Sequence, residues 1–261
     1  MARLPRIPDL LTTANLCCGA GSILLASQGQ LTGACWLVFL GALFDVFDGL
    51  AARALGGGTP LGAQLDSLAD MVTFGVAPAF ALWIAYSTEA FNPNNKFYTG
   101  FYLNGISTVV VAVAAVLLCI ASAWRLAKFN VDTRQTHGFL GLPTPANGLF
   151  WVSAILVVAD AGTTELAEHS GFQFTFIILF GQFPQVVLAV SVILSALMLS
   201  ELPLPSLKFK HKGWKGNEVM FLLLGIGSVL VILYGILAVP MILLLYLLSP
   251  FWGRLFPKQP A

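Results

Sequence analysis

Long apolar segments dominate this sequence and leave little chain for anything else. A helix that crosses a bilayer needs about 20 mostly apolar residues. Eight segments meet that need, at 9–28, 31–54, 62–86, 103–127, 144–161, 173–199, 217–237 and 239–255. Of the 261 residues, 57% are hydrophobic and only 10% are charged, whereas soluble domains carry about 25% charged residues. The sequence therefore predicts one all-α transmembrane domain over residues 1–261, a polytopic bundle of about eight spans.

Basic residues fall almost entirely on one side of such a bundle. Cytoplasmic loops of membrane proteins are enriched in Lys and Arg. With the N-terminus inside, Lys96 is the only one of the 13 Lys and Arg residues that lies outside. The cytoplasmic side holds Arg3, Arg6, Arg53, Arg125, Lys128, Arg134, Lys208, Lys210, Lys212, Lys215, Arg254 and Lys258. We therefore expect an integral protein of a cytoplasmic membrane with both termini in the cytoplasm. The net charge of +1 argues against nucleic acid as a partner, which would need a large basic patch.

Four carboxylates are concentrated in the segment FDVFDGLAARALGGGTPLGAQLDSLAD, residues 44–70. Asp45 and Asp48 are three residues apart and share one face of the second predicted span. Asp66 and Asp70 are four apart and share one face of the third. The short Gly-rich connection predicts that the two helices are antiparallel neighbours, with both pairs facing each other at the cytoplasmic end of spans 2 and 3.

Four negative charges at the edge of hydrocarbon are costly unless they are compensated. Arg53 is the nearest fixed cation and cannot neutralise all of them. Carboxylate oxygens suit hard cations such as Mg²⁺, Mn²⁺ or Ca²⁺, and Mg²⁺ often combines a few carboxylates with substrate phosphates. The segment therefore favours a metal-phosphate site. A buried charge network, a cation pathway and a proton relay are the alternatives.

Small and basic residues near the carboxylates fit a nucleotide. Gly49 and Ala52 follow the aspartates on the same face and leave room beside the backbone. Arg53 offers a fork of donors to a phosphate, and Gly62 places a helix N-terminus with free N–H groups nearby. Each glycine alone is equally typical of a tight turn or a helix contact.

The pattern Asp45-x-x-Asp48-Gly49-x-x-Ala52-Arg53, eight residues, then Gly62-x-x-x-Asp66-x-x-x-Asp70 resembles the signature of the CDP-alcohol phosphotransferases. The resemblance implies transfer of a phosphatidyl group from a CDP-linked lipid to an alcohol, with release of CMP. It further implies that the four aspartates hold two Mg²⁺ or Mn²⁺ ions and that Asp70 is also the base. Gly49, Ala52, Arg53 and Gly62 would line the CDP site. A homodimer is implied as well, with the last two spans peripheral.

Three further segments resemble the bacterial and archaeal membrane phosphatidylserine synthases of that family. They are IPDLLTTANLCCG (7–19), WRLAKFN (124–130) and GFLGLPTPANG (138–148). Asp9 stands where Asn is expected in that group. This likeness implies CDP-diacylglycerol and L-serine as substrates.

Serine brings a carboxylate, and three residues are candidates to bind it. Arg125 would hold the carboxylate, Asn130 would bond it or the nearby phosphate, and Asn15 is a buried amide facing the same place. Arg125 is equally typical of a span-flanking cation, and Asn15 of a tie between two helices. Glycerol 3-phosphate or inositol phosphate, the alternative acceptors, would need a denser basic cluster than this loop provides.

Two other classes use aspartate clusters in membranes. A cation transporter should show acids near the midplane and broken helices in two related halves. A membrane prenyltransferase should show two Asp-rich motifs far apart in the chain. The sequence shows neither pattern, so a transferase is the favoured interpretation.

Overall fold

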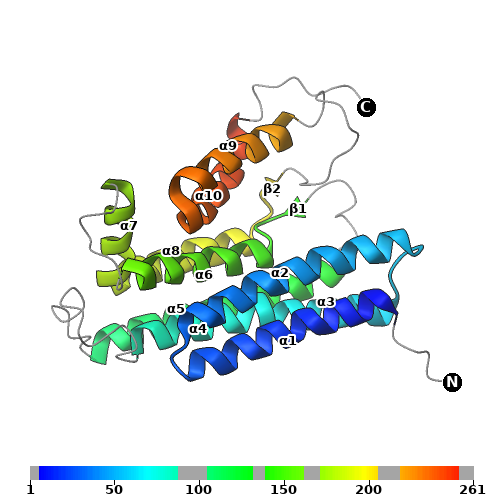
Figure 1. Ribbon diagram of the computed structural model, residues 1–261, viewed down its shortest axis with the longest axis horizontal. Coiled ribbons are helices and arrows are strands. Elements are labelled where there is room, and N and C mark those ends of the chain that lie inside the picture. The colour runs from blue at the N-terminus through cyan, green and yellow to red at the C-terminus, as the bar shows by residue number, and fades with distance from the viewer. Residues whose placement is uncertain (1–5, 88–104, 132–138, 162–170, 205–217, 253–261) are drawn as a thin grey trace.

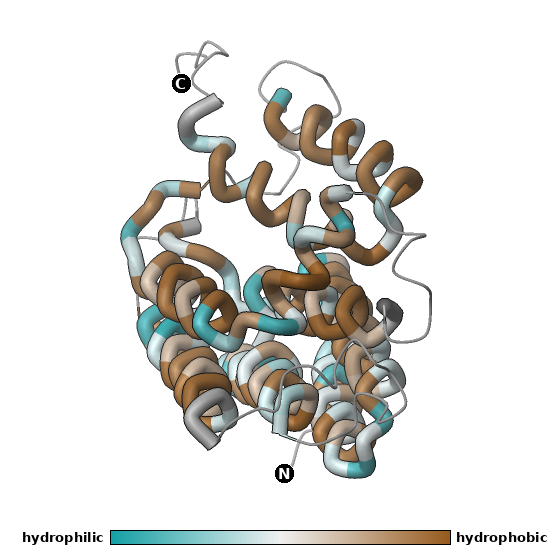
Figure 2. The backbone as a smooth tube through the Cα atoms, turned by 90° about the vertical axis from the view of Figure 1, so that its left-hand side faces the viewer, coloured by the Kyte–Doolittle hydropathy of each residue, from teal (hydrophilic) through white to brown (hydrophobic). Residues whose placement is uncertain are grey.

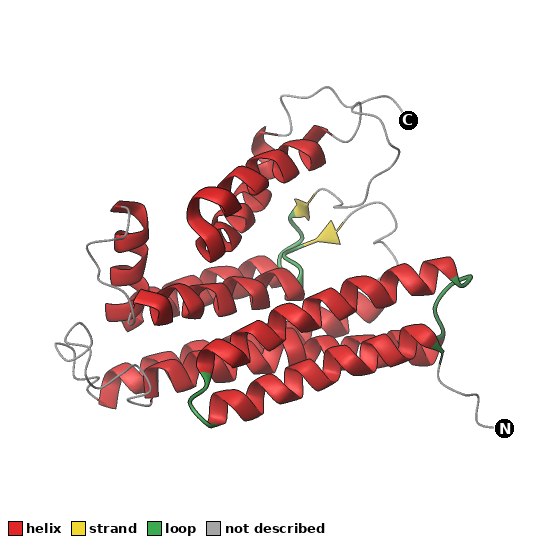
Figure 3. Ribbon diagram, in the orientation of Figure 1, coloured by secondary structure: helices red, strands yellow, loops and turns green. Residues whose placement is uncertain are grey.

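The computed structural model describes residues 6–87, 105–131, 139–161, 171–204 and 218–252. This part of the chain is almost entirely helical (Figure 3). Two short strands, β1 (Phe139–Leu140) and β2 (Pro203–Leu204), pair antiparallel. The helical elements are α1 (Ile7–Ser27), α2 (Leu31–Ala54), α3 (Pro60–Asp70), η1 (Met71–Val76), α4 (Ala77–Ser87), α5 (Gly105–Val131), α6 (Thr144–Ala161), α7 (Gly171–Gln182), α8 (Pro184–Leu199), α9 (Glu218–Tyr234), η3 (Gly235–Leu237) and α10 (Ala238–Trp252).

The helices form layers (Figure 1). The long helices α1, α2 and α5 lie lengthwise with the continuous α3–η1–α4 helix. Helices α6 and α8 cover them, and α9 and α10 lie beyond. Helix α1 packs along both α2 and α3, α5 packs on α8, and α10 packs on α6 and β2.

Hydrophobic residues make up most of the helices (Figure 2), and many of their large side chains are exposed. Large side chains such as Ile232, Val131 and Leu61 are 83%, 80% and 76% exposed. By length and composition, five helices can cross a membrane: Ile7–Ser27, Leu31–Ala54, Pro60–Ser87, Thr108–Val131 and Glu218–Pro250. A sixth is gained if α7 and α8 count as one span. The predicted helical membrane bundle is confirmed over the described residues, whereas the predicted count of eight spans is not.

One predicted span, 173–199, has a different shape from that expected, whereas the predicted spans 217–237 and 239–255 are two separate helices, α9 and α10. The segment 173–199 is not one kinked helix, because it breaks at Pro184 and α7 and α8 meet at a bend of 96°. Pro184 lacks an N–H and begins the new helix. Beyond it, α9 and α10 fold back on each other around Gly235, whose φ is +56°. A methyl group on Gly227 of α9 would lie 3.3 Å from Ile242 of α10.

Most of the cations behind the predicted orientation lie outside the described residues. These are Arg3, Lys96, Arg134, Lys208, Lys210, Lys212, Lys215, Arg254 and Lys258. The positions of the termini relative to a membrane therefore stay a prediction.

A π-helical turn, η1, is the point where three helices come closest. A methyl group on Gly19 of α1 would lie 2.8 Å from the Cα of Thr73, and one on Gly148 of α6 would lie 2.7 Å from the carbonyl oxygen of Phe74. One on Gly41 of α2 would lie 2.6 Å from Cγ2 of Thr73. Only glycine allows such close approach, and π-turns often occur at functional sites. Asp70 is the residue that immediately precedes this turn.

Gly148→Ala tests this packing. The added methyl group would press on the backbone of η1, so we expect the free energy of unfolding to fall by about 1–3 kcal/mol. Thermal unfolding of the detergent-solubilised protein would measure it. Gly225→Ala on α9 is the control, because a methyl group there meets nothing within 4 Å. Equal midpoints for the two variants would contradict the close contact.

Candidate active site

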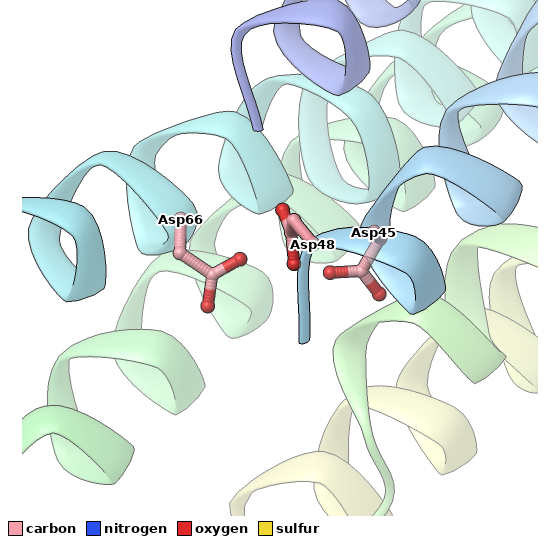
Figure 4. Close-up of side chains that lie close together, drawn as sticks. All are labelled: Asp45, Asp48 and Asp66. Carbon is pink, nitrogen blue, oxygen red and sulfur yellow. The ribbon is translucent and has the colours of Figure 1, made fainter. Parts of the chain in front are cut away.

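Three of the four predicted carboxylates converge (Figure 4). One oxygen from each of Asp45, Asp48 and Asp66 lies within 4.8 Å of the others. Asp45 and Asp48 come from the last turns of α2, and Asp66 comes from α3. The predicted spacing thus brings side chains from both helices to one place.

The helices that carry this cluster are not packed side by side as predicted. Helix α1 packs along both α2 and α3, whereas α2 and α3 are hardly in contact with each other. In the connection between them, Gly56 and Gly57 adopt φ values of +88° and +108°, which favour glycine. The carboxylates of α2 and α3 thus approach each other although the two helices are hardly in contact.

Helix α1 supports the cluster from one side through Thr12. This buried hydroxyl donates to Oδ2 of Asp48 at 2.7 Å and also lies 3.0 Å from the carbonyl oxygen of Pro8. Thr12 is not among the predicted site residues. Its signal in the sequence is weak, because a threonine inside an apolar span usually bonds the carbonyl four residues back.

Asp70 lies apart from the other three carboxylates. It is 9% exposed, and its Oδ1 accepts a bond from Nδ2 of Asn15 at 3.4 Å. The backbone carbonyl of Asn15 in turn accepts from Thr73 at 3.0 Å. Asn15 therefore does tie α1 to the helix that carries Asp70. Asp70 is also close enough to Asp45, Asp48, Asp66 and Arg125 to interact with them electrostatically.

The donor set of the cluster fits a hard divalent cation. Three carboxylates this close repel one another, and among the described residues none of them forms an ion pair. Oδ1 of Asp66 is buried and has no hydrogen-bond partner in the described part of the chain. All ligand atoms are oxygens, which suits Mg²⁺, Mn²⁺ or Ca²⁺.

The residues predicted for the CDP site lie around the turn between α2 and α3. Gly49, Ala52 and Arg53 occupy the end of α2, and Arg53 folds back so that its Nη1 would lie 3.5 Å from a methyl group on Gly49. The N–H of Gly62 is not free as predicted, because Thr59 caps α3 by accepting from it at 2.9 Å. Gly62 instead allows a close approach to α1, since a methyl group on it would lie 2.9 Å from Oδ1 of Asp9.

Two of the three residues predicted for the acceptor, Arg125 and Asn130, lie on α5, whereas the third, Asn15, lies on α1. Arg125 is 7% exposed, donates from Nε to the carbonyl of Leu142 at 3.2 Å, and lies over the ring of Phe129 at 5.0 Å. Asn130 lies beside the cluster, because its Oδ1 accepts from Ser67, the residue after Asp66, at 3.0 Å.

The fold and this cluster define the class of protein: it is an integral membrane helical bundle with a cluster of carboxylates. The profile of the CDP-alcohol phosphatidyltransferase family matches residues 6–197, which include every predicted site residue. The chain belongs to this family.

Several relatives have names that specify an acceptor. The chain is 32% identical over 243 residues to the CDP-diacylglycerol–serine O-phosphatidyltransferase of Helicobacter pylori, covering 92% of this chain and 87% of the relative. It is 34% identical over 146 residues to the enzyme of that name from Methanocaldococcus jannaschii, covering 56% and 58%. It is 36% identical over 141 residues to the archaetidylserine synthase of Methanothermobacter thermautotrophicus, covering 53% of each chain.

Asp66→Asn tests whether the cluster binds a cation. The substitution removes one repelling charge, so with a chelator present we expect the variant to unfold at the same temperature as the unaltered protein or higher. Mg²⁺ or Mn²⁺ at 100 times its dissociation constant should stabilise the unaltered protein by about 2.7 kcal/mol and the variant far less. Thermal unfolding in detergent measures both effects.

The matched control is Glu218→Gln on α9, which removes a carboxylate outside the cluster. It should leave the stabilisation by the cation intact. An equal cation effect in the Asp66 and Glu218 variants would argue against the metal site.

Proposed function

We propose that this protein transfers the phosphatidyl group of CDP-diacylglycerol to the hydroxyl of L-serine, forming phosphatidylserine and CMP. The observation that carries the proposal is the convergence of Asp45, Asp48 and Asp66 at the end of α2, in a chain that belongs to the CDP-alcohol phosphatidyltransferase family. The serine-specific names of its relatives support the acceptor.

The four aspartates would hold two divalent cations, Mg²⁺ or Mn²⁺. When bound, such ions supply positive charge to the diphosphate and to the departing CMP. Support comes from the all-oxygen donor set and from the buried Oδ1 of Asp66 that has no partner among the described residues. Asp70 would complete the set from its place at the start of η1.

The CDP group would lie over the end of α2. Gly49 and Ala52 present little side chain there, so the nucleotide can approach the helix backbone. Arg53 donates to a phosphate, and the guanidinium that now lies along Gly49 is exposed and able to turn toward it. Gly62 keeps the start of α3 close to α1 and so shapes the opposite wall.

Asp70 is the base in this proposal. An alcohol becomes a competent nucleophile when a carboxylate within reach removes its proton. The serine Oγ forms a bond to the lipid phosphorus, the bond from that phosphorus to the CMP oxygen breaks, and the serine proton goes to Asp70. Its electrostatic interactions with both the acidic cluster and Arg125 support this role, because in this proposal the cluster binds the CDP-lipid and Arg125 binds serine.

Arg125 binds the carboxylate of serine, and Asn130 and Asn15 bond polar groups beside it. The surroundings of Arg125 favour serine over acceptors that carry a phosphate. The neighbouring Lys128 pairs with Glu201 at 3.6 Å, which leaves less positive charge for a phosphate. Glycerol 3-phosphate and inositol phosphate remain the alternative acceptors.

The membrane arrangement follows from the same proposal. The protein spans the membrane about eight times as a homodimer, with the site at the cytoplasmic ends of spans 2 and 3 and both termini in the cytoplasm. The acyl chains of the substrate stay in the bilayer while its head group reaches the aspartates. Asp48 lies in the last two turns of the 24-residue helix α2 and Asp66 in the second turn of α3, which supports a site toward one surface of the membrane.

The first experiment is CMP release by the purified protein in detergent with CDP-diacylglycerol and Mg²⁺ or Mn²⁺, with and without L-serine. Release that requires serine is expected. Release that requires glycerol 3-phosphate or inositol phosphate instead would keep the chemistry and change the acceptor. If no acceptor supports metal-dependent release, a transport or structural role for the carboxylates replaces the proposal.

Asp70→Asn should keep binding of the CDP-lipid and lose turnover by at least 100-fold, the lower range for removal of a general base. Turnover is measured by CMP release, and binding by the thermal shift that CDP-diacylglycerol produces. Glu201→Gln is the control for loss of a carboxylate near the site. Near-normal turnover by the Asp70 variant would remove Asp70 as the base.

Arg125→Lys should raise KM for serine about tenfold or more and leave KM for CDP-diacylglycerol nearly unchanged. Lysine keeps the charge but cannot reproduce the planar fork of donors. Lys128→Ala provides the comparison, because it removes the neighbouring cation that already pairs with Glu201. Equal changes in both KM values for the Arg125 variant would point to a structural role.

A further inference from the structure

The start of α6 gathers buried polar groups that lack partners. Thr144 is the first residue of this helix, is fully buried, and has an Oγ1 without a hydrogen-bond partner in the described part of the chain. The N-terminus of a helix carries partial positive charge and leaves its first N–H groups without a partner within the helix. In α6 these are the N–H groups of Thr144 and Ala146, because Pro145 has no N–H and that of Asn147 donates to the carbonyl of Pro143 at 3.2 Å. An anion at this place would satisfy both.

Arg125 faces the same place from α5. Its Nε donates to the carbonyl of Leu142, two residues before Thr144. Its Nη2 is buried and has no partner among the described residues. An unsatisfied donor on a buried charged group is costly. The guanidinium is thus anchored on one edge and has bonding capacity left on the other.

The packing of α6 on η1 places this start beside Asp70. Gly148 lies against Phe74, and α6 runs in the same direction as α3–η1–α4 (Figure 1). One turn back along each helix leads from Gly148 to Thr144 and from Phe74 to Asp70. The electrostatic interaction between Arg125 and Asp70 agrees with this register.

Helix α10 supplies a further polar group beside Arg125. This helix lies beyond the residues that the family profile matches. Helix α10 packs on α6 and on β2. Tyr246 of this helix is 4% exposed and interacts electrostatically with Arg125. A tyrosine hydroxyl both donates and accepts hydrogen bonds, so it can orient a guanidinium or bond an anion beside it.

We propose that Thr144, the N–H groups of Thr144 and Ala146 at the start of α6, Arg125 and Tyr246 form the pocket that binds the carboxylate of the acceptor. This inference rests on the proposed function and names the part of the site that recognises serine. The carboxylate and the hydroxyl of serine are separated by two carbon atoms. A carboxylate bound at the start of α6 therefore brings the hydroxyl to Asp70. The last helices are then part of the acceptor site rather than peripheral to it.

Two variants that keep side-chain shape test the pocket, Thr144→Val and Tyr246→Phe. Each removes one hydroxyl. We expect KM for L-serine to rise about tenfold in each variant, the usual effect of losing one hydrogen bond to a charged group, while KM for CDP-diacylglycerol changes less than twofold. Serinol, which replaces the carboxylate with a hydroxymethyl group, serves as a competitor whose inhibition constant should stay within twofold.

The controls are Thr175→Val, on the exposed face of α7, and Tyr234→Phe, whose ring contact with Phe172 does not need the hydroxyl. In both control variants, KM for serine and KM for CDP-diacylglycerol should equal those of the unaltered protein. Unchanged KM for serine in both pocket variants would overturn the inference, as would equal rises in the constants for serine, serinol and CDP-diacylglycerol. If one of the two pocket variants fails to fold, the KM for serine of the other variant still tests the pocket. If the unaltered protein itself shows no serine-dependent release of CMP, the proposed function is refuted instead.

Discussion

Contact between helix backbones around η1 determines where the polar groups of the site lie. Gly19 and Gly148 bring α1 and α6 against this turn from two sides. Because the contacts involve backbone atoms, they leave little freedom for the helices to slide. Asp70 immediately precedes the turn, Asn15 reaches it from α1, and Thr144 begins one turn before Gly148. The same packing that holds the bundle together therefore sets the distances within the site.

The carboxylate cluster opposes that packing. Three acids within a few ångströms destabilise a chain that has no ion pair for them among the described residues. Thr12 offsets part of the cost by donating to Asp48. A local arrangement that costs stability is typical of a functional site. The rest of the bundle, with its apolar core and close helix contacts, supplies the stability that the cluster lacks.

The sequence predicted those features that depend on spacing along one helix. The apolar segments and the convergence of Asp45 and Asp48 with Asp66 follow from such spacing. Features that depend on contacts between distant segments were missed. Examples are α1 between α2 and α3, the bond from Thr12 to Asp48, and the cap by Thr59 that occupies the N–H of Gly62. The 96° break at Pro184 exceeded the predicted kink, because a proline marks where a helix can bend but not how far.

The Gly-rich turn between α2 and α3 has a consequence for the order of assembly. Asp45 and Asp66 are only 21 positions apart, and α1, which supports them, comes earlier in the chain. Proteins are synthesised from the N-terminus, and early segments fold first. The acidic centre can therefore assemble while α5, α6 and α10 are still being made. On the proposed assignment, the half of the site that would bind the nucleotide is then complete before the half that would bind the amino acid has left the ribosome.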